Sequence, residues 1–367
     1  MAPIVIDARD VAAAELRGWG RYTRELVAAL RAQPGLGLEL MVLAGGGRGP
    51  ELLFEQVGLP RILRRRSAAL VHAPNCFLPL LRPCPGVVTI HDLAFEAWPQ
   101  DFAAVTAAKF KLITPLAARS AQRIICPSRF TADDVCRRYR VDPGKIRVIA
   151  EAPALALGGR AGSVAGGRGE PVAGGRGASA AGGRGEPATG GQPGEPYVLA
   201  VGDLRAKKNL AALVRAFVAL RRRGAGHRLV LAGVDAGEGP WLRELAGGEP
   251  VQLTGYVSDA RLDALLAGAE LLVHPSLYEG FGLVVLEAMA RGTPVLAARA
   301  TALPETGGDA AEYFDPHDPR DLPRRLEALL QDAARRAELA RRGLARAAQF
   351  SWEQTARATA EVYRELL

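Results

Sequence analysis

Short apolar segments rich in β-branched residues alternate along the chain with longer segments whose apolar positions recur every three or four residues. The short apolar runs are typical of strands buried on both faces of a parallel sheet, and the longer periodic segments are typical of helices. The strands expected from this pattern occupy residues 4–6, 38–43, 70–72, 87–91, 123–126, 146–149, 197–201, 228–232, 252–254, 271–274 and 294–297.

The alternation of strands and helices predicts an α/β fold with two Rossmann-like domains, whose parallel sheets face each other across a central cleft. A length of 367 residues agrees with two domains rather than one. Because ligands of open α/β sheets bind at the carboxyl ends of the strands, we expect the functional residues to lie in the loops that line this cleft.

A segment of a different character separates the two groups of strands. Residues 158–196 repeat with a period of eight around the sequence GGRG and contain almost nothing that a core could bury, which predicts a flexible tether. The expected domains are therefore residues 1–157 and 197–350, followed by a helix at 351–367 that crosses back to the first domain. The four arginines and three glutamates of the tether nearly cancel, so most of the net charge of +8 belongs to the folded domains.

The composition excludes several classes of protein. An apolar content of 49% excludes a chain that is disordered throughout, and no apolar stretch of about 18 residues is free of charge, which excludes a membrane span. The first residues lack the features of a secretory signal, so we expect a cytoplasmic protein. The four cysteines (Cys76, Cys84, Cys126 and Cys136) have no CxxC spacing, and we expect them to be reduced and buried rather than to bind a metal.

The segment HPSLYEGFGLVVLEAMA carries two glutamates with seven residues between them. Glu279 is expected in the loop after a strand, and Glu287 more than a turn inside the helix that begins near Gly282. The amides of Phe281, Gly282 and Leu283 at this helix start are a natural seat for a phosphate. One carboxylate could hold ribose hydroxyls and the other a sugar, whereas the alternative is an amphipathic helix with two solvated glutamates.

Basic residues cluster in the turn VGDLRAKKNL, which leads from the strand at 197–201 to the helix at 210–222. Cations beside a helix N-terminus are disfavoured by the helix dipole, so Arg205, Lys207 and Lys208 suggest an anion that neutralises them. Asn209 is the expected N-cap of the helix. The alternative interpretation is three solvated basic residues.

Two further motifs lie in the first domain. Gly18 and Gly20 of RGWGRY follow the opening strand and allow close approach of the backbone to a ligand, although a lone GxG is weak evidence. His91 and Asp92 follow an apolar strand, so both side chains should face the cleft, where the histidine could orient or deprotonate a hydroxyl. We expect the other histidines to be structural or surface groups; these are His72, His227, His274 and His317.

Taken with the segments GWGRYTREL, VTIHDLAFEAWP, LTGYVSDARL and FSWEQTARATAEVYREL, the two glutamates resemble the E-x7-E motif of family 4 (group 1) retaining glycosyltransferases of the GT-B type, in particular mannosyltransferase-like members. The resemblance covers almost everything except the tether. It implies transfer of a hexose from a nucleotide-diphosphate sugar to a glycan or lipid-linked acceptor with retained configuration and no required metal, with GDP-mannose favoured over UDP-sugars.

The resemblance also implies residue roles. Lys207 and Lys208 would hold the diphosphate, Glu287 the ribose and Glu279 the donor sugar. The loop with Gly18 and Gly20 would close on the phosphates, and His91 would lie at the sugar and acceptor. Further candidates for the same site are Asp92, Asp203, Arg205, Tyr256 and Val257. Asp203 departs from the pattern, because many family members carry arginine there, and this removes one phosphate partner.

Several alternatives stay open at this stage. Retention without an obvious enzymic nucleophile suggests front-face attack, and Asp92 is the one candidate for a double displacement. The same architecture also serves nucleotide-sugar epimerases and catalytically silent sugar-nucleotide-binding proteins. Basic residues at 61–66 and at Lys109, Lys111, Arg119 and Arg123 predict peripheral contact with an anionic membrane. Nucleic acid is not expected as a partner, since no recognised module appears.

Overall fold

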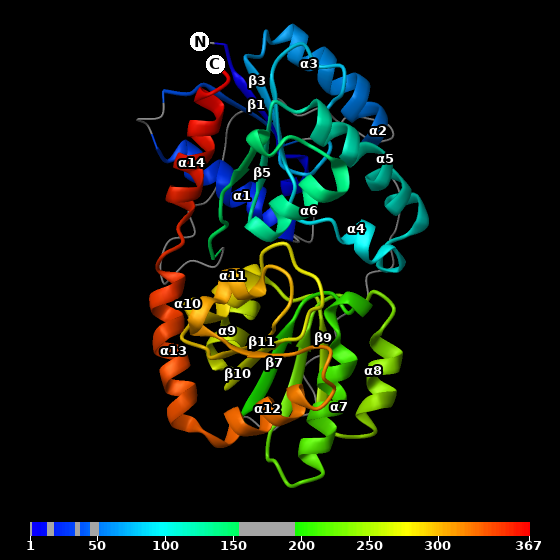
Figure 1. Cartoon of the computed structure of the whole chain (residues 1–367), viewed down its shortest axis with the longest axis vertical. Coiled ribbons are helices and arrows are strands. Elements are labelled where there is room, and N and C mark those ends of the chain that lie inside the picture. The colour runs from blue at the N-terminus through cyan, green and yellow to red at the C-terminus, as the bar shows by residue number, and fades with distance from the viewer. Residues whose placement is uncertain (1, 13–17, 34–36, 45–50, 154–194) are drawn as a thin grey trace, which may run out of the picture.

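Two parallel sheets of six strands form the framework of the chain, one above the other in Figure 1. The structure is a computed structural model, and it describes residues 2–12, 18–33, 37–44, 51–153 and 195–367. The tether predicted at 158–196 lies outside the described residues, apart from its last two. The sheets confirm the expected α/β fold with two Rossmann-like halves.

The first sheet has the strand order β2-β1-β3-β4-β5-β6. Its central strands are almost entirely buried, as their apolar sequences require. The strands are β1 (Ile4–Asp7), β2 (Leu40–Leu43), β3 (Leu70–Ala73), β4 (Gly86–Thr89), β5 (Arg123–Cys126) and β6 (Ile146–Val148). The helices of this half are α1 (Gly18–Arg31), α2 (Glu51–Leu53), α3 (Leu59–Arg65), α4 (Ala94–Ala97), α5 (Ala104–Ser120) and α6 (Arg129–Tyr139).

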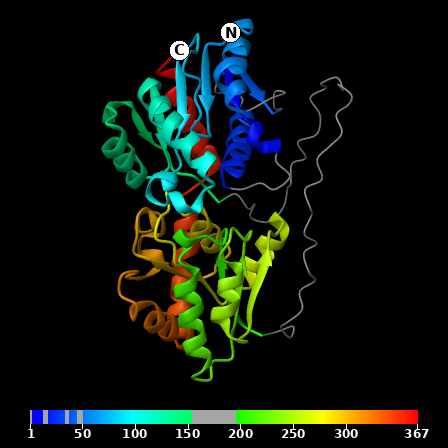
Figure 2. The same ribbon diagram turned by 90° about the vertical axis from the view of Figure 1, so that its right-hand side faces the viewer.

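The second sheet has the strand order β12-β11-β10-β7-β8-β9. Its strands are β7 (Tyr197–Val201), β8 (Arg228–Ala232), β9 (Val251–Gly255), β10 (Leu271–His274), β11 (Val295–Ala298) and β12 (Glu312–Phe314). Its helices are α7 (Leu210–Arg221), α8 (Gly239–Ala246), α9 (Asp259–Gly268), α10 (Leu283–Ala290), α11 (Leu303–Gly307), α12 (Asp321–Gln331) and α13 (Ala333–Ala347). Figure 2 shows helices on both faces of each sheet.

The last helix, α14 (Trp352–Arg364), leaves the second half and packs against α1 of the first (Figure 1). Its apolar face, with Ala356, Ala360 and Tyr363, shares a core with Tyr22 of α1 and with β1. The buried His72 accepts or donates at both ring nitrogens, 2.7 Å from Tyr363 Oη and 2.8 Å from Thr89 Oγ1. This histidine is therefore structural, as the sequence predicted.

The structure corrects some local expectations. β12 was not predicted, because its three residues give too short an apolar run to stand out. Asn209 does precede α7, but its backbone is left-handed (φ 52°) and its side chain makes no capping hydrogen bond. All four cysteines are free, although Cys84 and Cys136 are only half-buried.

The residues described contain no helix that is both long enough and apolar enough to cross a bilayer. The strands of each sheet run parallel, so the carboxyl ends of all strands in one sheet lie at the same edge. At the carboxyl ends of β4 and β10, residues of the two halves come into direct contact. These edges hold the residues considered next.

Candidate active site

Three side chains of the second half form the centre of the site. Lys208 follows β7, whereas His274 ends β10 and Glu279 lies in the loop after it. Lys208 Nζ lies 2.5 Å from Glu279 Oε1, and His274 Nε2 lies 3.2 Å from the same oxygen. Neighbouring parallel strands β7 and β10 bring these residues together, and the side chain of Glu279 is only 12% exposed. His274 was expected to be a structural or surface group, and the structure places its buried ring beside Glu279.

The charges of this cluster are strongly coupled. Burial alone would raise the pKa of Glu279, but Lys208, Lys207 and the hydrogen bond from His274 hold the pKa well below its usual value. Burial lowers the pKa of His274 despite the nearby carboxylate. At neutral pH the cluster therefore consists of a carboxylate, an ammonium group and a neutral imidazole that donates from Nε2.

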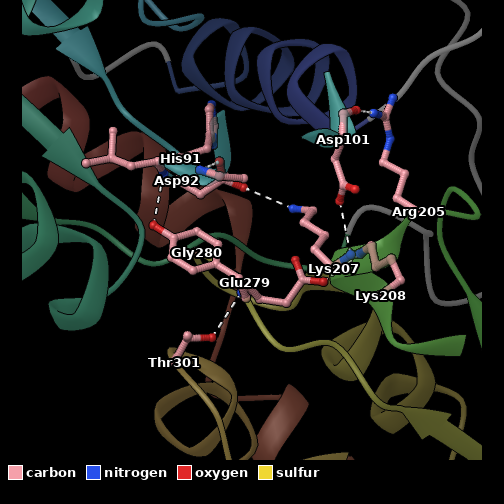
Figure 3. A network of polar contacts seen from close by, with 12 residues as sticks. His91, Asp92, Asp101, Arg205, Lys207, Lys208, Glu279, Gly280 and Thr301 are labelled. Atoms are coloured by element: carbon pink, nitrogen blue, oxygen red, sulfur yellow. Dashed lines mark hydrogen bonds and ion pairs between the residues drawn. The ribbon is translucent and has the colours of Figure 1, made fainter. Parts of the chain in front are cut away.

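Lys207 connects the two halves of the molecule (Figure 3). Its buried ammonium lies 3.6 Å from Asp92 Oδ2, and its backbone N–H donates to Asp101 Oδ2 at 3.0 Å. Burial alone would lower the pKa of Lys207, but the carboxylates of Asp92, Glu279 and Asp101 raise it above the ordinary lysine value. The anion expected beside these lysines is thus partly supplied by the protein itself, from Asp92 and Glu279.

Arg205 points away from the cluster toward the first half. Its guanidinium donates to the backbone carbonyl of Asp101 and lies 5.6 Å from the centre of the Phe102 ring. Asp203 lies 3.5 Å from the guanidinium through its Oδ2. The guanidinium of Arg205 therefore lies at the interface between the two halves. Contact with a phosphate, the role considered for it from the sequence, would require a different rotamer.

The helix α10 begins directly after the loop that holds Glu279. Gly282 is its N-cap residue with φ 99°, a conformation that favours glycine, and an added Cβ would lie 2.8 Å from Leu303 Cδ2. The ring of Phe281 is buried in the core beside Phe350, so only its backbone is available to a ligand. Leu283 is half-buried against the same core.

Glu287 lies inside α10 and is fully buried. Arg21 of α1 reaches across from the first half, and its Nη2 lies 3.1 Å from Glu287 Oε1 and 3.6 Å from Asp259 Oδ1. Arg24, one turn further along α1, lies 3.1 Å from the second oxygen of Asp259. Sequence reasoning missed Arg21, although its position directly after the GWG motif was a usable signal.

His91 is 7% exposed and both of its ring nitrogens have partners. Nδ1 lies 2.8 Å from Glu151 Oε1, and Nε2 lies 2.9 Å from the carbonyl oxygen of Pro74. The ring also makes an edge contact with Tyr22. Asp92, the next residue, accepts a hydrogen bond from Ala94 N–H at 2.9 Å. In this arrangement His91 has no free nitrogen with which to accept a proton.

The remaining candidates lie less close to the cluster. Gly18 and Gly20 belong to the first turn of α1 rather than to a loop, which corrects the expectation of a glycine loop; residues 13–17 lie outside the described ranges. Tyr256 is 42% exposed just after β9, and Val257 packs partly against the core. Neither has a polar contact that ties it to Lys208 or Glu279 in the part of the chain that the structure describes.

The site combines a charged carboxylate, two lysines, a helix N-terminus and a second buried carboxylate at the carboxyl edge of a Rossmann-like sheet. Such a set is suited to a ligand with both phosphates and hydroxyl groups. Family comparison agrees: the model described as "Glycosyltransferase Family 4" matches residues 16–151, and the model described as "Glycosyl transferases group 1" matches residues 186–346. The chain belongs to this glycosyltransferase family.

Particular relatives are similar over part of their length. The chain is 37% identical over 175 residues to the O-antigen chain mannosyltransferase B of Escherichia coli, which covers 46% of each chain. It is 34% identical over 265 residues to a D-inositol 3-phosphate glycosyltransferase of Salinispora tropica, which covers 67% of this chain and 51% of the relative. The chain thus spans about half the length of these curated relatives.

A solved structure matches the whole fold. The sucrose-phosphate synthase of Thermosynechococcus elongatus superposes with a TM-score of 0.74 at 22% identity, covering 100% of this chain and 99% of that one. At this identity the match shows the fold alone, and it confirms the GT-B architecture predicted from the sequence.

Proposed function

We propose that the chain is a retaining hexosyltransferase that moves mannose from GDP-mannose to a glycan or lipid-linked acceptor. The observation that carries this proposal is the ion pair of Lys208 and Glu279 beside the N-terminus of α10, with Glu287 inside the same helix. The mannose preference is supported by the similarity to the O-antigen chain mannosyltransferase B of Escherichia coli. UDP-sugars are the second choice of donor.

The donor diphosphate would lie against Lys207, Lys208 and the amides at the start of α10. Glu279 accepts one N–H of Lys208, which leaves the other two ammonium protons for phosphate oxygens. The charge that develops on the leaving diphosphate would be stabilised by these groups without a metal ion. We expect activity to survive EDTA.

The two glutamates would take hydroxyl groups of the donor. Glu279 stays charged at neutral pH and accepts hydrogen bonds only, so it suits a hydroxyl of the transferred sugar. Glu287, buried and held by Arg21, would accept from the ribose hydroxyls. Because Glu279 lies in the loop before α10 and Glu287 lies inside the helix, the diphosphate would lie between the two carboxylates, against the helix start.

The contacts of His91 and Asp92 favour front-face attack. Both nitrogens of His91 are occupied, and Asp92 is held by Ala94 N–H and faces Lys207, so neither is presented as a free base or nucleophile. The leaving phosphate oxygen would then accept the proton of the acceptor hydroxyl as the new glycosidic bond forms. His91 would shape the sugar and acceptor side of the site.

Exposed apolar and basic side chains of the first half suggest contact with a membrane. In the first half, α2 and α5 expose Leu53, Val105 and Leu112, and Lys109 of α5 contacts Glu51 of α2, so these helices are neighbours. Arg64 and Lys111 are exposed nearby on α3 and α5. We propose that this face contacts an anionic membrane that carries a lipid-linked acceptor, and that the protein is cytoplasmic.

The experiment is a donor screen followed by product analysis. GDP-, UDP- and ADP-sugars are compared by thermal shift, and the best donor is incubated with candidate acceptors, with the anomeric configuration of the product read by NMR. GDP-mannose should give the largest shift and an α-linked product. An epimerase would instead convert the donor without an acceptor, and a silent binding protein would show a shift but no product.

A further inference from the structure

The loop that carries Glu279 is fastened to the other half of the molecule. Gly280, the next residue, presents its carbonyl oxygen to two hydroxyl groups of the first half: Ser128 Oγ donates at 2.6 Å and Thr131 Oγ1 lies at 3.0 Å. Both hydroxyls are buried at the start of α6, which follows β5. Ser128 is also the N-cap of α6, because its oxygen accepts from Thr131 N–H.

Gly280 is required there by space rather than by backbone conformation. A Cβ added to this residue would lie 1.8 Å from the carbonyl oxygen of His91 and 2.8 Å from Asp92 Cβ. Its φ is not among the positive values, so alanine would be tolerated by the loop on its own. Only the close approach of the two halves forbids a side chain at this position.

Tyr278 and Glu305 make further contacts with the first half near Gly280. Tyr278 Oη donates to the buried Asp134 Oδ2 of α6 at 2.7 Å and accepts from Leu93 N–H at 3.2 Å. The carboxylate of Glu305 in α11 accepts from the N–H groups of Arg129 and Phe130 in the first turn of α6, at 2.9–3.3 Å. The loop Tyr278–Gly280, called the donor loop below, is therefore hydrogen-bonded to the first half on both sides of Glu279.

We propose that Ser128, Thr131 and Asp134 of the α6 region are positioning residues that hold the loop Tyr278–Gly280, and with it Glu279, against His91 for the transfer step. The proposal rests on the proposed function. These bonds exist only while the two halves are together, whereas Lys207, Lys208 and Glu287 all belong to the second half. Nucleotide binding should therefore not depend on them, but alignment of the donor sugar with the acceptor should.

The test compares Ser128→Ala, Thr131→Val and Gly280→Ala with wild type. Ser128→Ala is matched by Ser351→Ala, which also removes one serine N-cap, at the start of α14, but touches no residue of the donor loop. The dissociation constant for GDP is measured by calorimetry, and kcat is measured with GDP-mannose. We expect GDP affinity within about threefold of wild type throughout, kcat lower by about tenfold in Ser128→Ala, and lower by about a hundredfold in Gly280→Ala.

A second readout does not require activity. Hydrogen exchange of the peptide covering residues 275–282 should be faster in the Ser128, Thr131 and Gly280 variants than in wild type, and unchanged in Ser351→Ala. Normal kcat and normal exchange in Ser128→Ala and Gly280→Ala would overturn the positioning role. A wild-type protein that binds no nucleotide and transfers no sugar would instead refute the proposed function, and exchange would still decide whether α6 holds the loop.

Discussion

The Oε1 atom of Glu279 is the shared partner of the charged and polar groups at the centre of the site. It contacts Lys208 and His274, and Lys207 raises the positive potential around it. The sequence predicted Glu279, Glu287 and the lysine pair, because their spacing in a loop and a helix start is visible along the chain. The partners of Arg21 could not be predicted in the same way, since they depend on contact between the two halves. His274 contacts Glu279, only five residues further along the chain, but the sequence alone does not show that its ring turns toward that carboxylate.

The two glutamates should be separable by substitution. Glu279→Gln removes the negative charge near the transferred sugar and should lower kcat by about 10²–10³ while leaving the affinity for GDP nearly unchanged. Glu287→Gln should weaken GDP itself by about tenfold, because the ribose loses a charged acceptor. Calorimetry with GDP and steady-state kinetics with GDP-mannose check both; the same effect on GDP from both variants would contradict the division of roles.

Two buried histidines make the fold sensitive to acid. The pKa of His72 is lowered to about 3 by burial and by the nearby His91, and that of His274 is lowered chiefly by burial. Below their unfolded pKa, near 6.5, the unfolded chain binds protons that the folded chain does not, so stability falls as pH decreases. We expect the melting temperature to drop between pH 7 and pH 5.

The variant His72→Gln separates this effect from a general response to acid. It should melt lower than wild type at pH 7, because it loses hydrogen bonds to Tyr363 and Thr89, but it should lose less stability between pH 7 and pH 5, by up to about 1.4 kcal/mol per pH unit. His317→Gln, at an exposed position, should keep the wild-type slope. Equal slopes in all three proteins would contradict the assignment.

Among the elements, the strands were predicted best and the entrance to α1 worst. Buried parallel strands such as β7, β8 and β10 are continuous apolar runs, and their bounds agree with the sequence to the residue. The glycines of GWG suggested a loop, but they lie in the first turn of α1. Glycine permits a loop without requiring one, and here contacts of α1 with α14 and with Glu287 and Asp259 decide the outcome.

The ion pair between Arg21 of α1 and Glu287 of α10 allows the contact between these two helices to be tested. Arg21→Gln removes an ion pair from the buried Glu287 and should lower the melting temperature by several degrees, which corresponds to about 3 kcal/mol. The double variant Arg21→Gln/Glu287→Gln should be more stable than Arg21→Gln alone, because no charge is then left at the buried position. Additive losses in the double-mutant cycle would show that the pair does not couple α1 to α10.

At the scale of the whole molecule, the two halves are joined by contacts that the sequence does not reveal. Two Rossmann-like units follow from the periodicity, and the final helix α14 lies on α1 of the first half. The docking of α6 on the donor loop depends on hydroxyl groups and a glycine that are ordinary loop and cap residues when considered along the chain. The structure also modifies the basic patch that was expected to contact a membrane. Lys109 belongs to that patch, but it forms ion pairs with Glu51 and Glu55.

The exposed face of α2, α3 and α5 gives a prediction for membranes. The protein should sediment with vesicles that contain phosphatidylglycerol, and much less with phosphatidylcholine alone, because Arg64 and Lys111 favour anionic head groups. Leu112→Glu should reduce this binding by about tenfold, since it places a negative charge on the apolar part of the face. Leu344→Glu, at another exposed apolar position on α13 (48% exposed, against 62% for Leu112), should have no effect; equal loss in both variants would argue against this face.

The most direct test of the donor site is the affinity of the purified protein for GDP-mannose, measured by calorimetry for wild type, Lys208→Gln and Lys145→Gln. Lys145 lies in the first half and donates to a backbone carbonyl, so it controls for the loss of one positive charge. We predict that Lys208→Gln binds GDP-mannose at least about tenfold more weakly than wild type and that Lys145→Gln binds it normally. Equal affinity in wild type and Lys208→Gln would contradict the assignment of this cluster as the donor site.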